Sequence, residues 1–109
     1  MSIKSFFSEV ECYSVGDNVF SFVDGVEVGL RRSKAGDSVY IMKIRSTSRG
    51  QGLASETLCR ICDAADSNAV TLFLEIEADD RLTAEQLAEW YWRYGFRGSK
   101  TEMIREPAR

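Results

Sequence analysis

The order of hydrophobic and polar residues along the chain predicts a series of strands in its first half. Val19–Val23 and Val26–Leu30 are rich in strand-forming residues and flank the dipeptide Asp24-Gly25, which is typical of a two-residue hairpin turn. Ser38–Arg45 alternates with a period of two and predicts a third strand of the same meander. The polar, glycine-containing stretch from Arg31 to Asp37 is expected to be the turn between the second and third strands.

The second half changes to a helical period. Apolar residues recur at helical spacing across Leu53–Ala65, namely Leu53, Thr57, Leu58, Ile61, Cys62 and Ala65. The apolar run Val70–Glu77 follows and is expected to form a strand. Together with Ser38–Arg45 these segments predict a β-α-β unit with two parallel strands. The crossover between them is expected to be right-handed, as it is in nearly all proteins.

A second helix is indicated after residue 82. Thr83 and Gln86 form a capping-box pattern, and Gly95 is a C-terminal cap. One helix face is apolar and aromatic, with Leu87, Trp90, Tyr91 and Tyr94. Phe96–Arg105 is expected to be a last strand, whereas the residues up to Gly16 fit either a short helix or a first strand.

These elements predict an α+β fold, an α/β sandwich with a mixed sheet. With 109 residues, the chain is expected to form one domain, 1–109, because two cores of this kind need a longer chain. No apolar run approaches the roughly 20 residues of a membrane span, so we expect a soluble, cytoplasmic protein. The net charge of −3 argues against nucleic-acid binding and mildly favours cationic partners.

The chain has three cysteines and no histidine. Cys59 and Cys62 show C-x-x-C spacing, but a structural zinc site needs four ligands and no others are visible. We therefore expect no metal, and we expect Cys62 to pack on the apolar side of its helix. Without histidine, a catalytic base must be a carboxylate, tyrosine, lysine, cysteine or bound water.

The stretch Arg49-Gly50-Gln51-Gly52-Leu53-Ala54 joins the predicted third strand to the first helix. Two glycines at such a junction allow backbone N–H groups to approach a ligand, and the following helix N-terminus favours an anion. A P-loop needs Lys-Ser or Lys-Thr after the second glycine, and this is absent. A dinucleotide fingerprint needs a third glycine where Ser55 stands, and more parallel βαβ units than this chain can hold.

The segment Arg49–Ala54 matches the pattern Q/R-x-x-G-x-G/A at every specified position, and so resembles the acyl-coenzyme A loop of the GNAT N-acetyltransferases. A second feature of that family, Y-x-x-x-G-F, is matched by Tyr91-Trp92-Arg93-Tyr94-Gly95-Phe96. The stretch Thr71–Glu75 is similar to that of the ribosomal-protein alanine N-acetyltransferases within the family. The resemblance spans about Val39 to Ile104.

The resemblance implies direct transfer of an acetyl group from acetyl-CoA, the cosubstrate, to a primary amine such as a protein N-terminus, a lysine or a small amine. It implies that the pantetheine pairs with the backbone of Ile41, Met42 and Lys43. The pyrophosphate would be bound by the loop residues Arg49, Gly50, Gln51, Gly52, Leu53 and Ala54. Tyr91 would protonate the departing sulfur, and Glu75 would act as base, with Glu77 or a water as the other candidates.

The chain departs from the family in two respects. Asp80 stands where the family often has a cofactor-binding asparagine, and we assign it no binding role. The residues before Asn18 are too few for the strand and two helices that begin most members, so these N-terminal helices are reduced or missing. We expect an acceptor pocket that is either open or completed by a second subunit in a homodimer.

Two further functions are considered. A catalytically inactive GNAT-like module that binds acyl-CoA or a partner protein is the alternative to the enzyme. A redox protein that uses Cys59 and Cys62 is a weaker alternative, because the pair falls in the middle of a helix. Arg31, Arg32 and Lys34 fit a solvated turn better than a contact to the adenosine 3′-phosphate.

Overall fold

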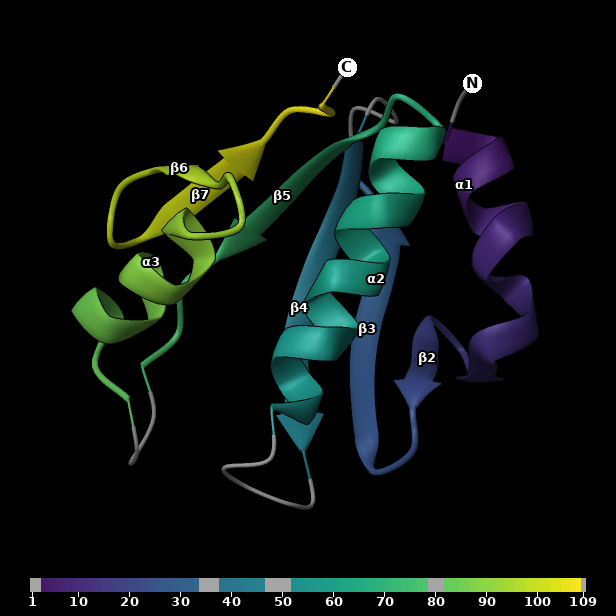
Figure 1. Cartoon of the computed structure of the whole chain (residues 1–109), viewed down its shortest axis with the longest axis horizontal. Coiled ribbons are helices and arrows are strands. Elements are labelled where there is room, and N and C mark those ends of the chain that lie inside the picture. Colours follow the sequence, from purple (N-terminus) through teal and green to yellow (C-terminus); the bar gives the residue numbers. More distant parts are fainter. Residues whose placement is uncertain (1–2, 34–37, 47–51, 79–81, 109) are drawn as a thin grey trace.

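The computed structural model describes residues 3–33, 38–46, 52–78 and 82–108. Consecutive strands in the first half are followed by helices and strands in turn (Figure 1). The helical elements are α1 (Ile3–Val10), a single 3₁₀ turn (Glu11–Tyr13), α2 (Leu53–Ser67) and α3 (Ala84–Trp92). The strands are β1 (Ser14–Gly16), β2 (Val19–Val23), β3 (Val26–Arg32), β4 (Ser38–Ser46), β5 (Thr71–Glu75), β6 (Arg97–Gly98) and β7 (Glu102–Arg105).

All seven strands belong to one mixed sheet, in the order β1-β2-β3-β4-β5-β7-β6. β4 and β5 are parallel, and every other neighbouring pair is antiparallel. The predicted meander and the parallel β-α-β unit are therefore confirmed, as is the α+β class.

The three helices lie on the same face of the sheet. Trp90 of α3 donates a hydrogen bond from Nε1 to Ser55 Oγ of α2 at 3.2 Å. Arg105 of β7 contacts Asp66 of α2 and the carbonyl of Tyr94, just after α3. α1 packs against α2. Figure 1 shows α2 in front of β3 and β4, with α1 beside it.

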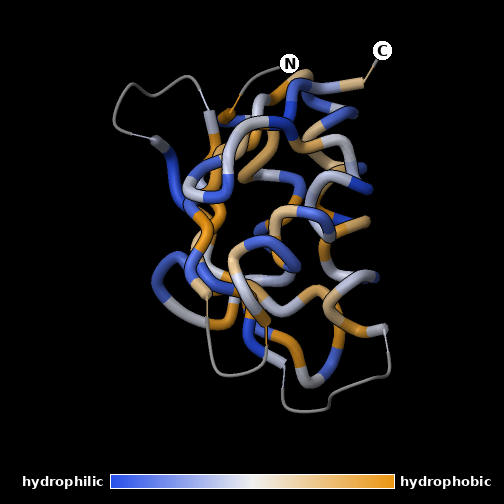
Figure 2. The backbone as a smooth tube through the Cα atoms, turned by 90° about the vertical axis from the view of Figure 1, so that its left-hand side faces the viewer, coloured by the Kyte–Doolittle hydropathy of each residue, from blue (hydrophilic) through white to orange (hydrophobic). Residues whose placement is uncertain are grey.

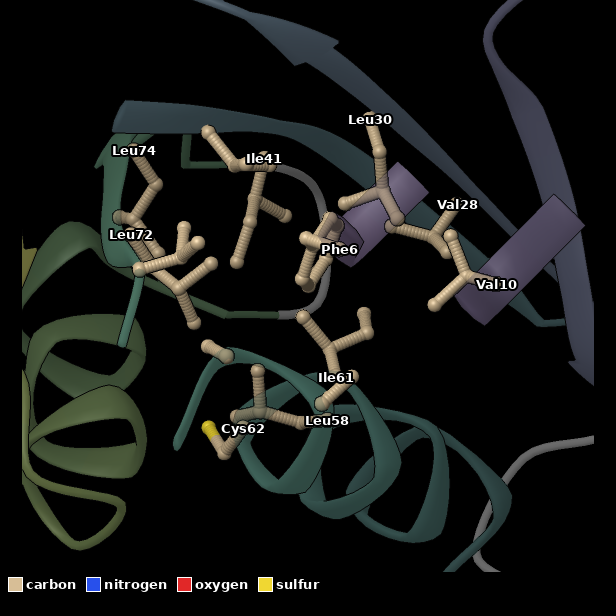
Figure 3. Packing of buried hydrophobic residues seen from close by; sticks show 14 of the residues in the cluster. Phe6, Val10, Val28, Leu30, Ile41, Leu58, Ile61, Cys62, Leu72 and Leu74 are labelled. Atoms are coloured by element: carbon tan, nitrogen blue, oxygen red, sulfur yellow. The ribbon is translucent and has the colours of Figure 1, made fainter. Parts of the chain in front are cut away.

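The core fills the space between the sheet and α2. Alternate residues of the strands point toward the helix, and Ile41, Leu72 and Leu74 are each no more than 1% exposed. Figure 3 shows them facing Leu58 and Ile61 of α2. Each large aliphatic side chain buried in this way stabilises the fold by about 1.5–3 kcal/mol, which explains why α2 is held on this face.

Four sequence predictions need correction or refinement. Arg31 and Arg32 belong to β3 and not to a turn, because they pair with Tyr40 and Val39 of β4. β5 ends at Glu75, two residues earlier than predicted. The ambiguous N-terminal segment forms a helix, α1, followed by the edge strand β1.

The fourth correction concerns Phe96–Arg105, which forms a hairpin of two short strands and not one strand. Gly98 has a φ of 149°. Ser99 then closes the turn, because its N–H donates to the carbonyl of Glu102 at 2.9 Å and its hydroxyl shares a hydrogen bond with that of Thr101 at 2.8 Å.

Hydrophilic and hydrophobic residues are interleaved along the tube of the backbone (Figure 2). In keeping with this pattern, none of the helices in the described ranges is both long and apolar enough to cross a membrane.

Candidate functional site

β4 and β5 diverge at the carboxyl end of β4. The two strands pair from Ser38↔Thr71 to Ile41↔Leu74, but β4 continues to Ser46. Figure 1 shows β5 turning away from β4 toward α3. Beyond Ile41, β4 therefore no longer pairs with β5. Met42 and Lys43 are the first residues of this unpaired part of β4.

The same two residues form a β-bulge against β3. Val28 pairs with Ile44 and Leu30 pairs with Ile41, so Met42 and Lys43 together oppose the single residue Gly29. A bulge of this kind bends and twists its strand. The bulge lies where β4 separates from β5, so the bend that it introduces contributes to the divergence of the two strands.

Gly29 makes the bulge sterically possible. A Cβ atom at this position would lie 2.5 Å from Met42 Cε and 2.8 Å from Met42 Cβ. The Cε atom could move aside by rotation, but the Cβ atom is fixed to the backbone of β4. The sequence analysis did not identify Gly29, although a glycine inside a strand pattern is a signal of a bulge or of close backbone approach.

α2 begins at the same end of β4. Its N-cap residue, Gly52, has a left-handed φ of 70° and no side-chain capping hydrogen bond. Among the described residues other than its chain neighbours, none has an atom within 4 Å of the position that a Cβ of Gly52 would occupy. The first intrahelical hydrogen bond is donated by the N–H of Glu56 to the carbonyl of Gly52. The N–H groups of Leu53 and Ala54 precede it, and helix geometry gives them no partner within the helix.

Three residues of the predicted loop, Arg49, Gly50 and Gln51, lie outside the described residues, as does Asp80. The other predicted residues of the loop, Gly52, Leu53 and Ala54, lie at the first turn of α2. This half of the loop follows the end of β4 at Ser46 after the segment 47–51, which lies outside the described residues.

Glu75 lies at the end of β5, exposed, and on the face of the sheet opposite to the helices, as strand alternation predicts. Its Oε1 accepts a hydrogen bond from the Tyr40 hydroxyl at 2.9 Å. The Tyr40 ring packs against Phe73 with centroids 5.5 Å apart, and the guanidinium of Arg31 lies 4.7 Å from its centre. Burial, followed by the hydrogen bond to the Glu75 carboxylate, raises the pKa of Tyr40.

Tyr91 lies on the other face of the sheet, within the core. It is 9% exposed and makes edge-on ring contacts with Trp90 and Phe96, at centroid distances of 4.9 and 5.4 Å. Burial raises the pKa of the Tyr91 hydroxyl to about 12, so the phenol is protonated at neutral pH. Tyr91 and Glu75 are therefore not adjacent, and they lie on opposite faces of the sheet.

The remaining predicted residues are placed as follows. Cys62 is buried in the core and burial raises the pKa of its thiol to about 12, whereas Cys59 is exposed. Trp90 packs against the core, and Trp92 is 55% exposed. Within the ranges that the structure covers, no cluster of metal-ligating side chains is found.

Sequence reasoning missed Tyr40 as a site residue. Tyr40 pairs with Phe73, and Glu75 is two positions further along β5 on the same face. Once β4 and β5 are known to be parallel, period-two alternation places all three side chains together. The exact register, which alternation cannot supply, was the missing information.

No protein-family model matches the chain, and no curated protein sequence matches it. The structure is similar to the crystal structure of the anti-CRISPR protein AcrVA5, with a TM-score of 0.63 and 21% sequence identity. The match covers 77% of this chain and 93% of that one. At this identity the likeness concerns the fold, and the two proteins share an α+β architecture built on a mixed sheet.

Proposed function

We propose that the protein is an acetyl-CoA-dependent N-acetyltransferase that transfers an acetyl group directly to a primary amine. The observation that carries the proposal is the divergence of β4 from β5 beyond Ile41, in the strand that precedes α2, whose N-cap is Gly52. Such an arrangement would offer one ligand both an unpaired stretch of strand backbone and a helix N-terminus, which favours an anion. The GNAT-like sequence motifs fall on these two elements and on α3.

The described residues fit the cosubstrate. The open space at the Cβ position of Gly52 allows a phosphate oxygen to approach the N–H groups of Leu53 and Ala54, where the helix dipole also favours an anion. Ile41, Met42 and Lys43 would present backbone groups to the pantetheine as an added strand does. Arg49, Gly50 and Gln51 would complete the loop.

The reaction needs a base and an acid on the two sides of the thioester. The amine nitrogen attacks the carbonyl carbon, a C–N bond forms and the C–S bond breaks. Glu75 accepts the proton that the nitrogen gives up, and Tyr91 donates one to the sulfur, so the products are an N-acetyl amine and coenzyme A thiol. Both residues then exchange protons with solvent.

The proposal is tested by calorimetric titration with coenzyme A. We expect saturable binding for the unmodified chain. Gly52→Asp and Gly52→Asn form a matched pair, because both side chains tolerate a left-handed φ and they differ only in charge. We expect the aspartate variant to bind at least about tenfold more weakly than the asparagine variant, since an added carboxylate repels the pyrophosphate. Absence of binding at millimolar coenzyme A would refute acetyl transfer.

A second candidate is a GNAT-like module that binds acyl-CoA without catalysis. The observation that favours it is the packing of Tyr91 in the core, because this burial gives the residue a structural role independent of any reaction. Transfer of acetyl groups to an amine panel, followed by the release of free thiol, separates the two candidates. An enzyme turns over and a module binds without turnover.

A further inference from the structure

The face of the sheet opposite to the helices presents a continuous row of side chains. Register places these residues directly across from one another on four neighbouring strands, in the order Arg31, Tyr40, Phe73 and Ile104. Tyr40 and Phe73 are half-buried, and Ile104 is 48% exposed. Within the described ranges, all the helices pack on the opposite face, so this row is not covered by a helix.

The row already holds one cationic side chain of the protein itself. The Arg31 guanidinium lies over the Tyr40 ring at 4.7 Å, in the geometry of a cation–π contact. The neighbouring surface, made by the Phe73 ring and the 48% exposed Ile104 side chain, is apolar, and the aliphatic stem of a long side chain packs on apolar surface of this kind.

Two carboxylates lie next to this surface. Glu75 pairs directly with Glu102 across β5 and β7, and both are exposed. Like charges directly opposite one another in an antiparallel pair are destabilising, and a cation bound between them relieves the repulsion. The Tyr40 hydroxyl fixes the Glu75 carboxylate at 2.9 Å, on the Phe73 side of the pair.

We propose that this face is the docking surface for an extended polypeptide segment that presents a lysine side chain. The lysine stem would lie on Phe73 and Ile104, and its ammonium group would lie between Glu75 and Glu102. The claim that the bound lysine is the acetyl acceptor rests on the proposed function. The docking of the lysine-bearing segment does not depend on that function.

The lack of a covering helix on this face, within the described ranges, decides between kinds of ligand. Small-molecule sites are concave and enclose most of their ligand, whereas this face is an open sheet surface. An extended chain obtains affinity from many contacts across such a surface. Arg31 and Arg97 lie at the two ends of the row, so its negative charge is confined to Glu75 and Glu102. A single lysine placed between these two carboxylates is the side chain whose charge is complementary there.

Binding is measured first without any cosubstrate. A fluorescein-labelled heptapeptide with one central lysine is titrated with the protein and followed by anisotropy, beside the same peptide with a central glutamate. We expect saturable binding of the lysine peptide, at least about tenfold tighter than that of the glutamate peptide, and weakened by salt.

Three variants locate the binding surface. Ile104→Ser and Glu102→Gln are each expected to weaken binding of the lysine peptide about three- to tenfold. The first substitution removes apolar contact and the second removes negative charge. Val15→Ser is the matched control, since Val15 is 58% exposed but belongs to β1, at the far edge of the sheet. Both altered side chains on the face are exposed, so these variants are expected to fold, which circular dichroism checks.

The outcomes separate the two proposals. Equal affinity for the two peptides, or affinity unchanged by both Ile104→Ser and Glu102→Gln, overturns the docking surface even if coenzyme A binds. Lysine-specific binding that depends on these residues, in a chain that binds no coenzyme A, keeps the docking surface and refutes acetyl transfer. If both bind, the KM for the lysine peptide should rise in Ile104→Ser while the KM for acetyl-CoA stays constant.

Discussion

Tyr91 shows two properties at the scale of the single residue that point to different roles. Its burial suits a core side chain, and the same burial raises the pKa of its hydroxyl to about 12, which keeps the phenol protonated. A proton donor has to be protonated before the reaction, so the packing of the ring is compatible with the role of acid. The two roles are separable by a substitution that keeps the ring.

We predict that Tyr91→Phe lowers kcat about 100-fold, within the range that loss of a general acid usually causes, and leaves the affinity for coenzyme A unchanged. Tyr94→Phe is the matched control, because Tyr94 lies just after the same helix and its ring is only partly buried against the core. Rates are measured from thiol release. Equal rates for the two variants would assign Tyr91 to packing alone.

Thr57 offers a prediction about stability. It is fully buried in α2, and its hydroxyl has no hydrogen-bond partner among the described residues. We predict that Thr57→Val raises the free energy of unfolding by about 1 kcal/mol, because a methyl group of similar size replaces an unpaired polar group. Urea denaturation measures this change. Thr57→Ala removes the same hydroxyl but leaves a cavity, so it should be less stable than Thr57→Val.

Three single-residue predictions that concern local chemistry are confirmed. Thr83 and Gln86 form the reciprocal capping box, Gly95 has a positive φ of 99° after α3, and Cys62 is buried. Each depends on neighbours within a few positions. The Tyr40–Glu75 hydrogen bond joins residues 35 positions apart, and no local pattern encodes such a contact.

At the scale of the element, the bulge in β4 links the sheet to the proposed cosubstrate site. We predict that Gly29→Ala destabilises the fold by about 1–3 kcal/mol, as overpacking of a filled site does, because its Cβ meets Met42 Cβ at 2.8 Å. It should also weaken coenzyme A binding, since Met42 and Lys43 would be displaced. Denaturation and calorimetry measure the two effects.

Gly16→Ala is the control for this substitution. The Cβ built at Gly16 is 3.9 Å from its nearest neighbour, Val19 Cβ, and the residue does not have a positive φ. Little change is expected in either measurement. A Gly29→Ala variant that matched this control would show that the bulge does not depend on the glycine.

The elements that the sequence predicted correctly have strong periodicity, as in α2 and β4. The errors fall where tertiary pairing overrides composition. Arg31 and Arg32 look like turn residues, yet β4 supplies ladder partners that extend β3. The hairpin of β6 and β7 depends on a serine turn between two very short strands, which are too short to show any period. For the candidate site, the motifs located the helix end and Tyr91, but the bulge and the strand divergence are properties of register.

At the scale of the whole molecule, a part-buried ion pair joins three elements. Arg105 of β7 binds both carboxylate oxygens of Asp66, at 2.7 and 3.1 Å, and donates from Nε to the Tyr94 carbonyl at 2.7 Å. Asp66 also accepts from the N–H of Ala108 at 2.8 Å. The end of α2, the end of α3, β7 and the C-terminal segment thus meet at Arg105, which fixes how the half of the molecule with α3 packs on the half with α2.

This ion pair predicts a dependence of stability on pH. The hydrogen bonds from Arg105 lower the pKa of the Asp66 carboxyl in the folded protein, and the bond from Ala108 adds to the effect. A carboxyl whose folded pKa is depressed contributes its full stabilisation above the unfolded value of about 3.9. That contribution is lost as the pH falls from there through the folded pKa, because protonation of Asp66 leaves the Arg105 guanidinium without its counter-charge.

We therefore predict that the free energy of unfolding falls more steeply below about pH 4 in the unmodified protein than in Asp66→Asn. At pH 7 the Asp66→Asn variant should be less stable by about 3 kcal/mol, as when one partner of a buried pair is removed. Replacing both partners, in Asp66→Asn with Arg105→Met, should recover part of this loss, since no unpaired charge remains buried.

Urea denaturation between pH 2.5 and 7 measures all three proteins. Glu56→Gln is the control, because the exposed pair of Glu56 with Arg60 contributes little. Parallel pH profiles for the unmodified protein and Asp66→Asn would show that the packing of the two halves does not depend on this charge.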